Sequence, residues 1–133
     1  MDILLAEDDA GIRTILVEFL TEEGYVVIAA EHGADALALL ATTAVLPRVI
    51  LLDLMMPVMS GWAFRAQQRL NPHWADIPVI MLTASPALSE AHGPMQAARV
   101  LSKPIDLDDL LVAVQQYCEP SMQLRRQASA ALS

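Results

Sequence analysis

Five short apolar runs alternate with segments of helical periodicity, and this alternation constrains the fold of the chain more than any other feature. The apolar runs predict buried strands, and apolar residues recurring at i, i+3, i+4 and i+7 between them predict amphipathic helices. Parallel strands joined by helices require right-handed crossovers, which place helices on both faces of the sheet. The predicted strands are residues 3–6, 25–29, 49–52, 79–82 and 100–102. The sequence therefore predicts an α/β fold with a doubly wound, five-stranded parallel sheet.

Capping residues bound the predicted helices. Asp9 is a suitable N-cap and Gly24 a suitable C-terminal stop for a helix near residues 10–23. Asp106 caps the last predicted helix, and Glu119 with Pro120 ends it. The remaining clear helices are expected at residues 35–41 and 62–70. These signals place each helix between two predicted strands, as the fold class requires, or after the last strand.

Length, charge and cysteine content narrow the class of protein. The 133 residues correspond to one domain, and their 55% apolar content suffices for a sizeable core. Eight Lys and Arg residues against sixteen Asp and Glu give a net charge of −8, which disfavours nucleic acid and anionic membrane surfaces as partners. Cys118, the single cysteine, is expected in the core, and neither a secretory signal nor a membrane-spanning run is visible. A cytoplasmic location follows as the expectation.

Polar residues follow four of the five predicted strands. Glu7, Asp8 and Asp9 come after the first strand, Asp53 after the third, Thr83 after the fourth, and Lys103, the single lysine, after the fifth. Ligands of open parallel sheets bind at the carboxyl ends of the strands, so these side chains are expected to meet at one edge. An acidic residue after a strand is also a common helix N-cap, and that structural role is favoured for Asp9.

The predicted cluster has the chemistry of a phosphoryl-transfer site. Carboxylates brought close together repel one another, and a hard divalent cation such as Mg²⁺ relieves this repulsion while it retains waters and a phosphate. An aspartate carboxylate can attack phosphorus to give an acyl phosphate, while a metal ion and a lysine neutralise the phosphoryl oxygens and a hydroxyl donates to one of them. The residues thus favour a phosphoryl site with Mg²⁺ as its cofactor.

The chain resembles a two-component response regulator receiver domain over about residues 2–118. The resemblance rests on Glu7–Asp8, Asp53, Thr83 and Lys103–Pro104, with Met56–Pro57, Met59 and Gly61 after the third strand. It implies a flavodoxin-like sheet of strand order 2-1-3-4-5. It also implies that Asp53 is the phosphoacceptor.

The resemblance assigns roles to the other site residues as well. It implies that Asp8 binds Mg²⁺ directly, that Glu7 helps through water, and that Met55 lends its backbone carbonyl. It implies that Thr83 and Lys103 contact the phosphoryl group. The bond between Lys103 and Pro104 is expected to be cis. The side chains of Met55, Met56, Met59 and Met81 are interpreted as packing around the site.

Two features depart from the family pattern. Receivers usually carry a Tyr or Phe three residues before the lysine, as a switch that rotates inward after phosphorylation, and this chain has Val100 there. Between residues 84 and 98, Pro86 and the pair Gly93–Pro94 interrupt the helical period, which predicts a short or irregular helix. These departures indicate an unusual output surface.

The leading hypothesis is a receiver in a phosphorelay, in which a histidine kinase or phosphotransfer protein phosphorylates Asp53 and so changes the affinity for a downstream protein partner. Its reactions would be self-phosphorylation from a phosphodonor and autodephosphorylation, without turnover of an external substrate. The alternative is an atypical receiver that acts as a phosphate-independent protein interaction module, as Val100 indicates. A phosphatase of the haloacid dehalogenase type is disfavoured, because the Asp-x-Asp that it needs after the first strand is absent from Glu7-Asp8-Asp9.

The expected organisation is a receiver domain over residues 1–118 followed by a C-terminal tail over residues 119–133. The sequence leaves open the cognate kinase, the downstream target and the lifetime of the acyl phosphate. It also leaves open a homodimer, and whether the chain is part of a longer regulator.

Overall fold

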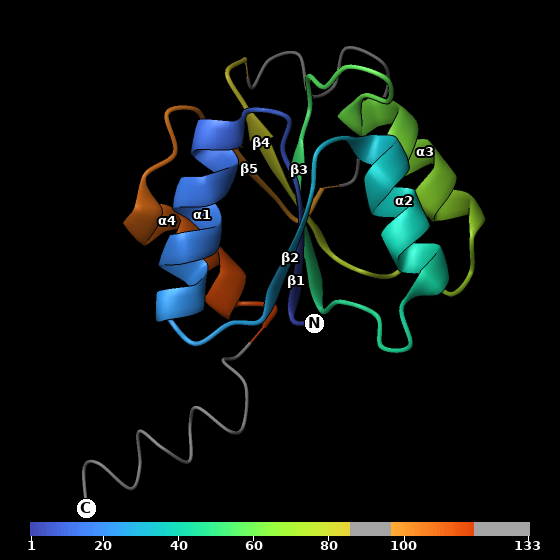
Figure 1. The fold of residues 1–133 in the computed structure, drawn as a ribbon, viewed down its shortest axis with the longest axis horizontal. Coiled ribbons are helices and arrows are strands. Elements are labelled where there is room, and N and C mark those ends of the chain that lie inside the picture. The colour runs from blue at the N-terminus through green and yellow to red at the C-terminus, as the bar shows by residue number, and fades with distance from the viewer. Residues whose placement is uncertain (86–96, 119–133) are drawn as a thin grey trace, which may run out of the picture.

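A parallel sheet with helices on both faces forms the core of the computed structural model, which describes residues 1–85 and 97–118 (Figure 1). The strands are β1 (Ile3–Ala6), β2 (Val27–Ala30), β3 (Val49–Asp53), β4 (Val79–Thr83) and β5 (Arg99–Ser102). They pair in parallel in the order β2-β1-β3-β4-β5. The predicted fold class and the strand order 2-1-3-4-5 are both confirmed.

Within residues 1–85 and 97–118, two helices cover each face of the sheet. The described helices are α1 (Ala10–Glu22), α2 (Gly33–Thr42), α3 (Gly61–Leu70) and α4 (Leu107–Gln115). Figure 1 shows α1 and α4 on one side of the sheet and α2 and α3 on the other. Successive strand residues point to opposite faces, so Leu5 packs into the cluster with α1 and α4, and Leu4 packs into the cluster with α2 and α3. Burial on both faces explains why β1, β3 and β4 are apolar without alternation.

Side-chain caps set where the helices begin. Asp9 accepts a hydrogen bond from the Ile12 backbone N–H at 2.9 Å, and Asp106 accepts one from Asp109 at 3.0 Å. These bonds satisfy donors that the first turn of a helix leaves unpaired. The predicted capping roles of Asp9 and Asp106 are confirmed.

Several predicted boundaries are wrong by a few residues. Strand β2 begins at Val27 instead of residue 25, and α2 begins at Gly33 because the His32 ring accepts from the Asp35 N–H at 3.3 Å. Helix α4 ends at Gln115, ahead of the predicted stop at Glu119. Cys118 is buried, as expected, and lies just beyond that helix.

Two predictions fall outside the described residues. The irregular helix expected between residues 84 and 98 lies largely within residues 86–96, and the predicted tail is residues 119–133. Among the helices of the described residues, none has the length and apolar character needed to cross a membrane.

Candidate functional site

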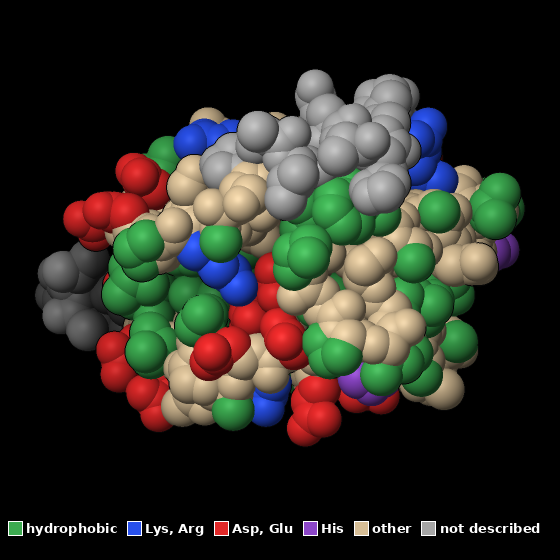
Figure 2. Space-filling view, turned by 90° about the horizontal axis from the view of Figure 1, so that it is seen from above, with side chains coloured by type: hydrophobic (Ala, Val, Ile, Leu, Met, Phe, Trp, Pro, Cys, Tyr) green, Lys and Arg blue, Asp and Glu red, His purple; other side chains and the backbone are tan. Residues whose placement is uncertain are grey.

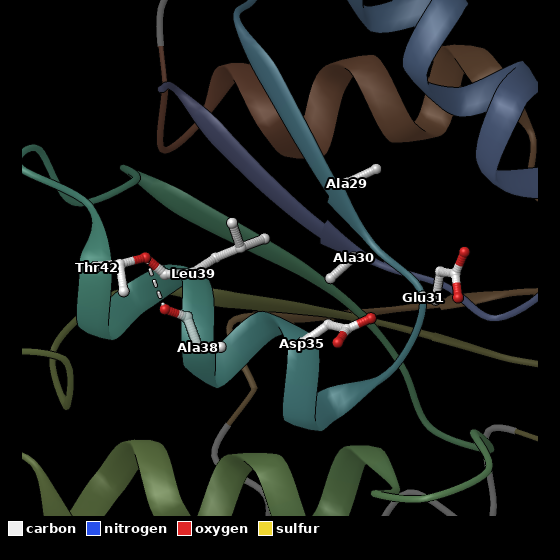
Figure 3. A pocket seen from close by; sticks show the side chains of 7 residues that line it. All are labelled: Ala29, Ala30, Glu31, Asp35, Ala38, Leu39 and Thr42. Carbon is white, nitrogen blue, oxygen red and sulfur yellow. Dashed lines mark hydrogen bonds between the residues drawn. The ribbon is translucent and has the colours of Figure 1, made fainter.

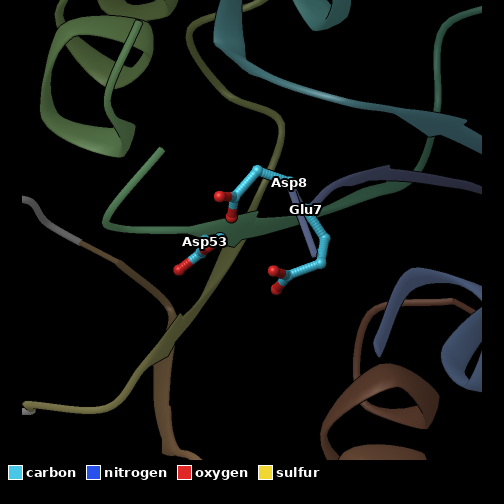
Figure 4. Close-up of side chains that lie close together, drawn as sticks. All are labelled: Glu7, Asp8 and Asp53. Atoms are coloured by element: carbon cyan, nitrogen blue, oxygen red, sulfur yellow. The ribbon is translucent and has the colours of Figure 1, made fainter. Parts of the chain in front are cut away.

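Three carboxylates converge where β1 and β3 end. Glu7 and Asp8 follow β1 and Asp53 is the last residue of β3, and each offers an oxygen within 4.8 Å of the others (Figure 4). Glu7 and Asp53 are buried, whereas Asp8 is exposed. Figure 2, which views this edge of the molecule from above, shows acidic side chains gathered at the centre of the face. The parallel pairing of β1 with β3 brings these residues together.

The turn after Asp53 is packed against the backbone of that residue. The Gly61 N–H donates to the Leu54 carbonyl at 2.9 Å, and a Cβ on Gly61 would lie 2.6 Å from the Asp53 carbonyl oxygen. No other residue fits this approach without a shift in the backbone. The Met55 N–H donates to Asp53 Oδ1 at 3.3 Å, which helps to fix the carboxylate. Gly61 therefore serves close packing at the start of α3.

Lys103 brings a positive charge to the carboxylates from the opposite end of the sequence. Its Nζ lies 2.8 Å from Glu7 Oε2 and 3.4 Å from Asp53 Oδ1. The Lys103 N–H donates to the Thr83 carbonyl at 2.8 Å, which continues the pairing of β4 with β5 and directs the side chain toward the site. The bond from Lys103 to Pro104 is cis. The lysine thus pairs with both buried acids of the cluster.

Burial and neighbouring carboxyl groups raise the pKa of Asp53 to about 7, from an ordinary value of 3.8. Removal from water is the largest cause, followed by the hydrogen bond to Asp8 and the charge of Glu7. The charge of Lys103 and the hydrogen bond from the Met55 N–H act to lower the pKa of Asp53. Burial also acts to lower the pKa of Lys103, but its contacts with Glu7 and Asp53 outweigh burial and raise that pKa.

Thr83 ends β4 with its side chain buried. Its hydroxyl oxygen accepts a hydrogen bond from the Ser85 N–H at 3.0 Å. A hydroxyl that accepts through a lone pair keeps its own hydrogen for donation. Thr83 can therefore donate to an oxygen atom of a ligand at the carboxyl edge.

The chemistry of the donor set fits a hard divalent cation. Glu7, Asp8 and Asp53 offer only oxygen ligands, and few carboxylates together with an exposed flank suit an ion that keeps several waters, as Mg²⁺ does. Met55 follows the cluster with its side chain 59% exposed. Its interpretation as packing around the site is therefore wrong, and the use of its carbonyl stays a prediction.

Val100 stands apart from the cluster. It lies on the edge strand β5, pairs in register with Met81 and is 40% exposed. The structure thus places the predicted switch position at the surface of the sheet edge, whereas Glu7, Asp8, Asp53 and Lys103 come together.

A separate hollow lies between β2 and α2. Its volume is about 450 Å³, and Figure 3 shows its lining, with Glu31 at the end of β2 and Asp35 at the start of α2. The other lining residues are Ala29, Ala30, Ala38, Leu39 and Thr42. None of the predicted site residues lines this hollow.

Sequence reasoning missed Arg13, whose guanidinium reaches back to the turn that carries Glu7 and Asp8. Arg13 Nη1 donates to the Glu7 carbonyl at 2.9 Å and to the Asp8 carbonyl at 3.4 Å. A signal for this role was present, because Arg13 is near the N-terminus of α1, where the helix dipole disfavours a positive charge.

Comparisons with known proteins agree with this geometry. Residues 3–115 match the family model of the response regulator receiver domain. The chain is 36% identical over 122 residues to the transcriptional regulatory protein GlrR of Escherichia coli, and this match covers 90% of the chain but 26% of GlrR.

Two solved structures show the same fold. The chemotaxis protein CheY4 of Vibrio cholerae is 30% identical, with a TM-score of 0.76, and the match covers 87% of this chain and 97% of that one. The receiver domain of the sensor histidine kinase PA1611 of Pseudomonas aeruginosa, described with a magnesium ion coordinated in its active site cleft, is 25% identical. Its TM-score is 0.77, and 87% of this chain and 95% of that one are covered. The chain belongs to the response regulator receiver domain family, whose members are signalling domains of two-component systems.

Proposed function

We propose that this receiver accepts a phosphoryl group on Asp53 from a histidine kinase or a phosphotransfer protein, and that the modification changes its affinity for a downstream protein partner. One observation carries the proposal. The Asp53 carboxylate lies at the carboxyl edge of the sheet, 3.4 Å from the Lys103 ammonium and within 4.8 Å of carboxylate oxygens of Glu7 and Asp8. A nucleophilic carboxylate, a cation and metal-binding oxygens thus share one small site.

The reaction transfers a phosphoryl group from an oxygen or nitrogen atom of the donor to a carboxylate oxygen of Asp53. An ionised Asp53 oxygen attacks the phosphorus atom, the bond from phosphorus to the donor breaks, and its electron pair leaves with the donor. The product is an acyl phosphate. In autodephosphorylation, water attacks the same phosphorus, the bond from phosphorus to the Asp53 oxygen breaks, and inorganic phosphate leaves as the Asp53 carboxylate is regenerated. No external substrate is consumed beyond the phosphodonor.

Thr83 and Lys103 would bind the oxygens of the incoming group. Lys103 already pairs with Asp53, so its ammonium is close enough to neutralise a phosphoryl oxygen attached there. The Thr83 hydroxyl accepts from Ser85 and retains a hydrogen with which to donate to another phosphoryl oxygen.

Glu7, Asp8, Asp53 and the Met55 carbonyl would hold Mg²⁺. When bound, Mg²⁺ supplies positive charge that favours the ionised form of Asp53 and offsets the charge of the phosphoryl oxygens. The donor set supports this assignment, and so does the magnesium ion described for the Pseudomonas receiver. A buried Asp53 with a raised pKa is a poor nucleophile while protonated, so the cation and Lys103 both favour the reactive form.

The proposal assigns the receiver to residues 1–118 and a tail to residues 119–133. It keeps the cytoplasmic location that the sequence predicts. The chain spans about a quarter of the length of GlrR, a transcriptional regulatory protein.

Intact-mass measurement tests the proposal directly. The protein is incubated with Mg²⁺ and a small acyl-phosphate donor, alongside Asp53→Asn and alongside Asp76→Asn, which changes an exposed aspartate away from the site. We expect one hydroxylamine-labile phosphoryl group on the wild type and on Asp76→Asn, and none on Asp53→Asn.

A kinase or phosphotransfer donor serves as the second phosphodonor. Absence of phosphorylation with both donors, in a folded sample that binds Mg²⁺, would refute phosphoacceptance. Equal partner affinity for the wild type and Asp53→Asn would then support the phosphate-independent interaction module.

A further inference from the structure

Arg13 connects three parts of the chain around the acidic turn. It lies on α1, and its guanidinium donates to the carbonyls of Glu7 and Asp8, which form the turn between β1 and α1. Arg13 Nη2 lies 3.9 Å from Oε1 of Glu31, at the end of β2. The arginine thus bridges a helix, the acidic turn and the neighbouring strand end.

The hydrogen bonds from Arg13 hold the backbone carbonyls of Glu7 and Asp8, and the position of this backbone sets where the two carboxylates point. Asp8 is exposed, so the position of its carboxylate depends on the backbone of the turn. Glu7 is fixed further by its N–H, which donates to the Ala30 carbonyl at 3.1 Å, and by Oε1, which accepts from the Asp9 N–H at 3.1 Å. Arg13 is therefore placed to hold the turn on the Asp8 side, where the side chain itself is in water.

The ion pair to Glu31 is the weaker of the two connections. The Glu31 side chain is 72% exposed, and ion pairs in water contribute little. Figure 3 shows Glu31 at the end of the hollow between β2 and α2. The hydrogen bonds to the carbonyls must therefore carry most of any effect of Arg13 on the site.

We infer that Arg13 is a positioning residue of the metal site, whose guanidinium fixes the Glu7–Asp8 turn and thereby raises the affinity for Mg²⁺ without contacting the ion. This inference rests on the proposed function, because it presupposes that the acidic cluster binds Mg²⁺. Outer groups that orient metal ligands typically change metal affinity by about 10- to 100-fold.

Charge and positioning make opposite predictions for this residue. A guanidinium near a cation site repels the ion, so an effect of charge alone would make Arg13→Gln bind Mg²⁺ more tightly and leave Arg13→Lys unchanged. An effect of positioning makes both variants bind more weakly, because a lysine ammonium keeps the charge but has no second nitrogen, so it cannot hold the two carbonyls through one nitrogen while another faces Glu31, as Nη1 and Nη2 of Arg13 do. The pair of variants therefore separates the two explanations.

The experiment is a titration with Mg²⁺, followed by the amide NMR signals of Glu7, Asp8 and Asp53. Arg13→Lys and Arg13→Gln are compared with the wild type and with Arg69→Gln, a matched change at an exposed position on α3, across the sheet. We expect the Kd for Mg²⁺ to rise about tenfold or more in both Arg13 variants and to stay unchanged in Arg69→Gln. Free energies of unfolding, measured without Mg²⁺, show whether affinity falls in variants that remain fully folded.

Each result decides a separate point. An unchanged or lower Kd in Arg13→Lys and Arg13→Gln would overturn the positioning role while leaving the proposed function intact. A wild type that shows no Mg²⁺ binding in the millimolar range would overturn the metal site itself, and with it the inference. If Arg13→Gln does not fold, Arg13→Lys decides alone, because it retains the charge and the aliphatic stem.

Discussion

The two sides of the site are built on different parts of the sheet. Its acidic side follows β1 and β3, which are interior strands with every residue buried. The other side belongs to β4 and β5, and β5 is an edge strand on which Val100 and Ser102 are exposed. Groups that repel one another are thus held at the ends of interior strands, while the edge strand β5 leads into a single cation, Lys103.

The same contrast appears in the energetics. On the acidic side, burial and like charge raise the pKa of Asp53, which means that its ionised form is less stable in the folded protein than in water. Lys103, from the edge side, offsets part of this cost through contacts at 2.8 and 3.4 Å. Removal of the Asp53 charge should therefore stabilise the folded protein, whereas removal of the Lys103 charge should destabilise it.

The largest effect is expected for Asp53→Asn in the absence of Mg²⁺, and it is stabilising. Because the folded state binds the Asp53 proton more tightly than the unfolded chain, the unfolding free energy of the wild type falls as pH rises from about 4 to about 7. Asp53→Asn has no such titration, so the amount by which its unfolding free energy exceeds that of the wild type grows through that pH window and levels off above it. One pKa unit corresponds to about 1.4 kcal/mol, which sets an upper limit of about 4 kcal/mol.

Urea unfolding with a chelator at several pH values measures this advantage. Asp76→Asn is the control, since Asp76 is exposed and far from the cluster in sequence. A constant difference between Asp53→Asn and the wild type across pH 4 to 8 would contradict the raised pKa.

A destabilising effect of about 3 kcal/mol is expected for Lys103→Met, because the change leaves the fully buried Glu7 without its ion pair. The double variant with Glu7→Gln should recover much of this loss, since the uncompensated charge is then absent. A double-mutant cycle by chemical unfolding measures the coupling. Additive losses would show that Lys103 does not stabilise the acidic side through Glu7.

Gly61→Ala should destabilise the acidic side by about 2 kcal/mol, because the new Cβ meets the Asp53 carbonyl oxygen, a backbone atom. Gly11→Ala is the matched control, since its Cβ would meet only the Asp9 side chain at 3.3 Å. Thermal unfolding of both variants gives the comparison. Equal stability of the two would indicate that the turn after β3 moves at little cost.

The smallest effect is expected for Val100→Tyr on the edge strand, below about 0.5 kcal/mol, because the position is partly exposed and aromatic residues suit strands. Leu101→Ala, one residue further and buried, should cost about 2 kcal/mol or more. Unfolding in urea measures both. A large loss in Val100→Tyr would show that the edge of β5 is packed as tightly as the interior strands.

The sequence alone was enough to predict most of the fold and the main candidate residues. Each apolar run and each helical period is local, so the order of elements could be read from them, and the motif of separated polar residues gave the family. Boundaries were less accurate where a capping residue was unusual: His32 as an N-cap has little propensity signal, and it set the start of α2.

By itself, then, the sequence determined that Glu7, Asp8, Asp53, Thr83 and Lys103 would lie at strand ends, because alternation of strands and helices fixes which edge each strand end reaches. Only the tertiary structure decided how they interact. The contact between Lys103 and Glu7 joins residues 96 positions apart, the raised pKa of Asp53 depends on burial by distant segments, and the reach of Arg13 to the acidic turn depends on how α1 leaves β1. Distances and desolvation are properties of the packed molecule, and no local pattern of residues encodes them.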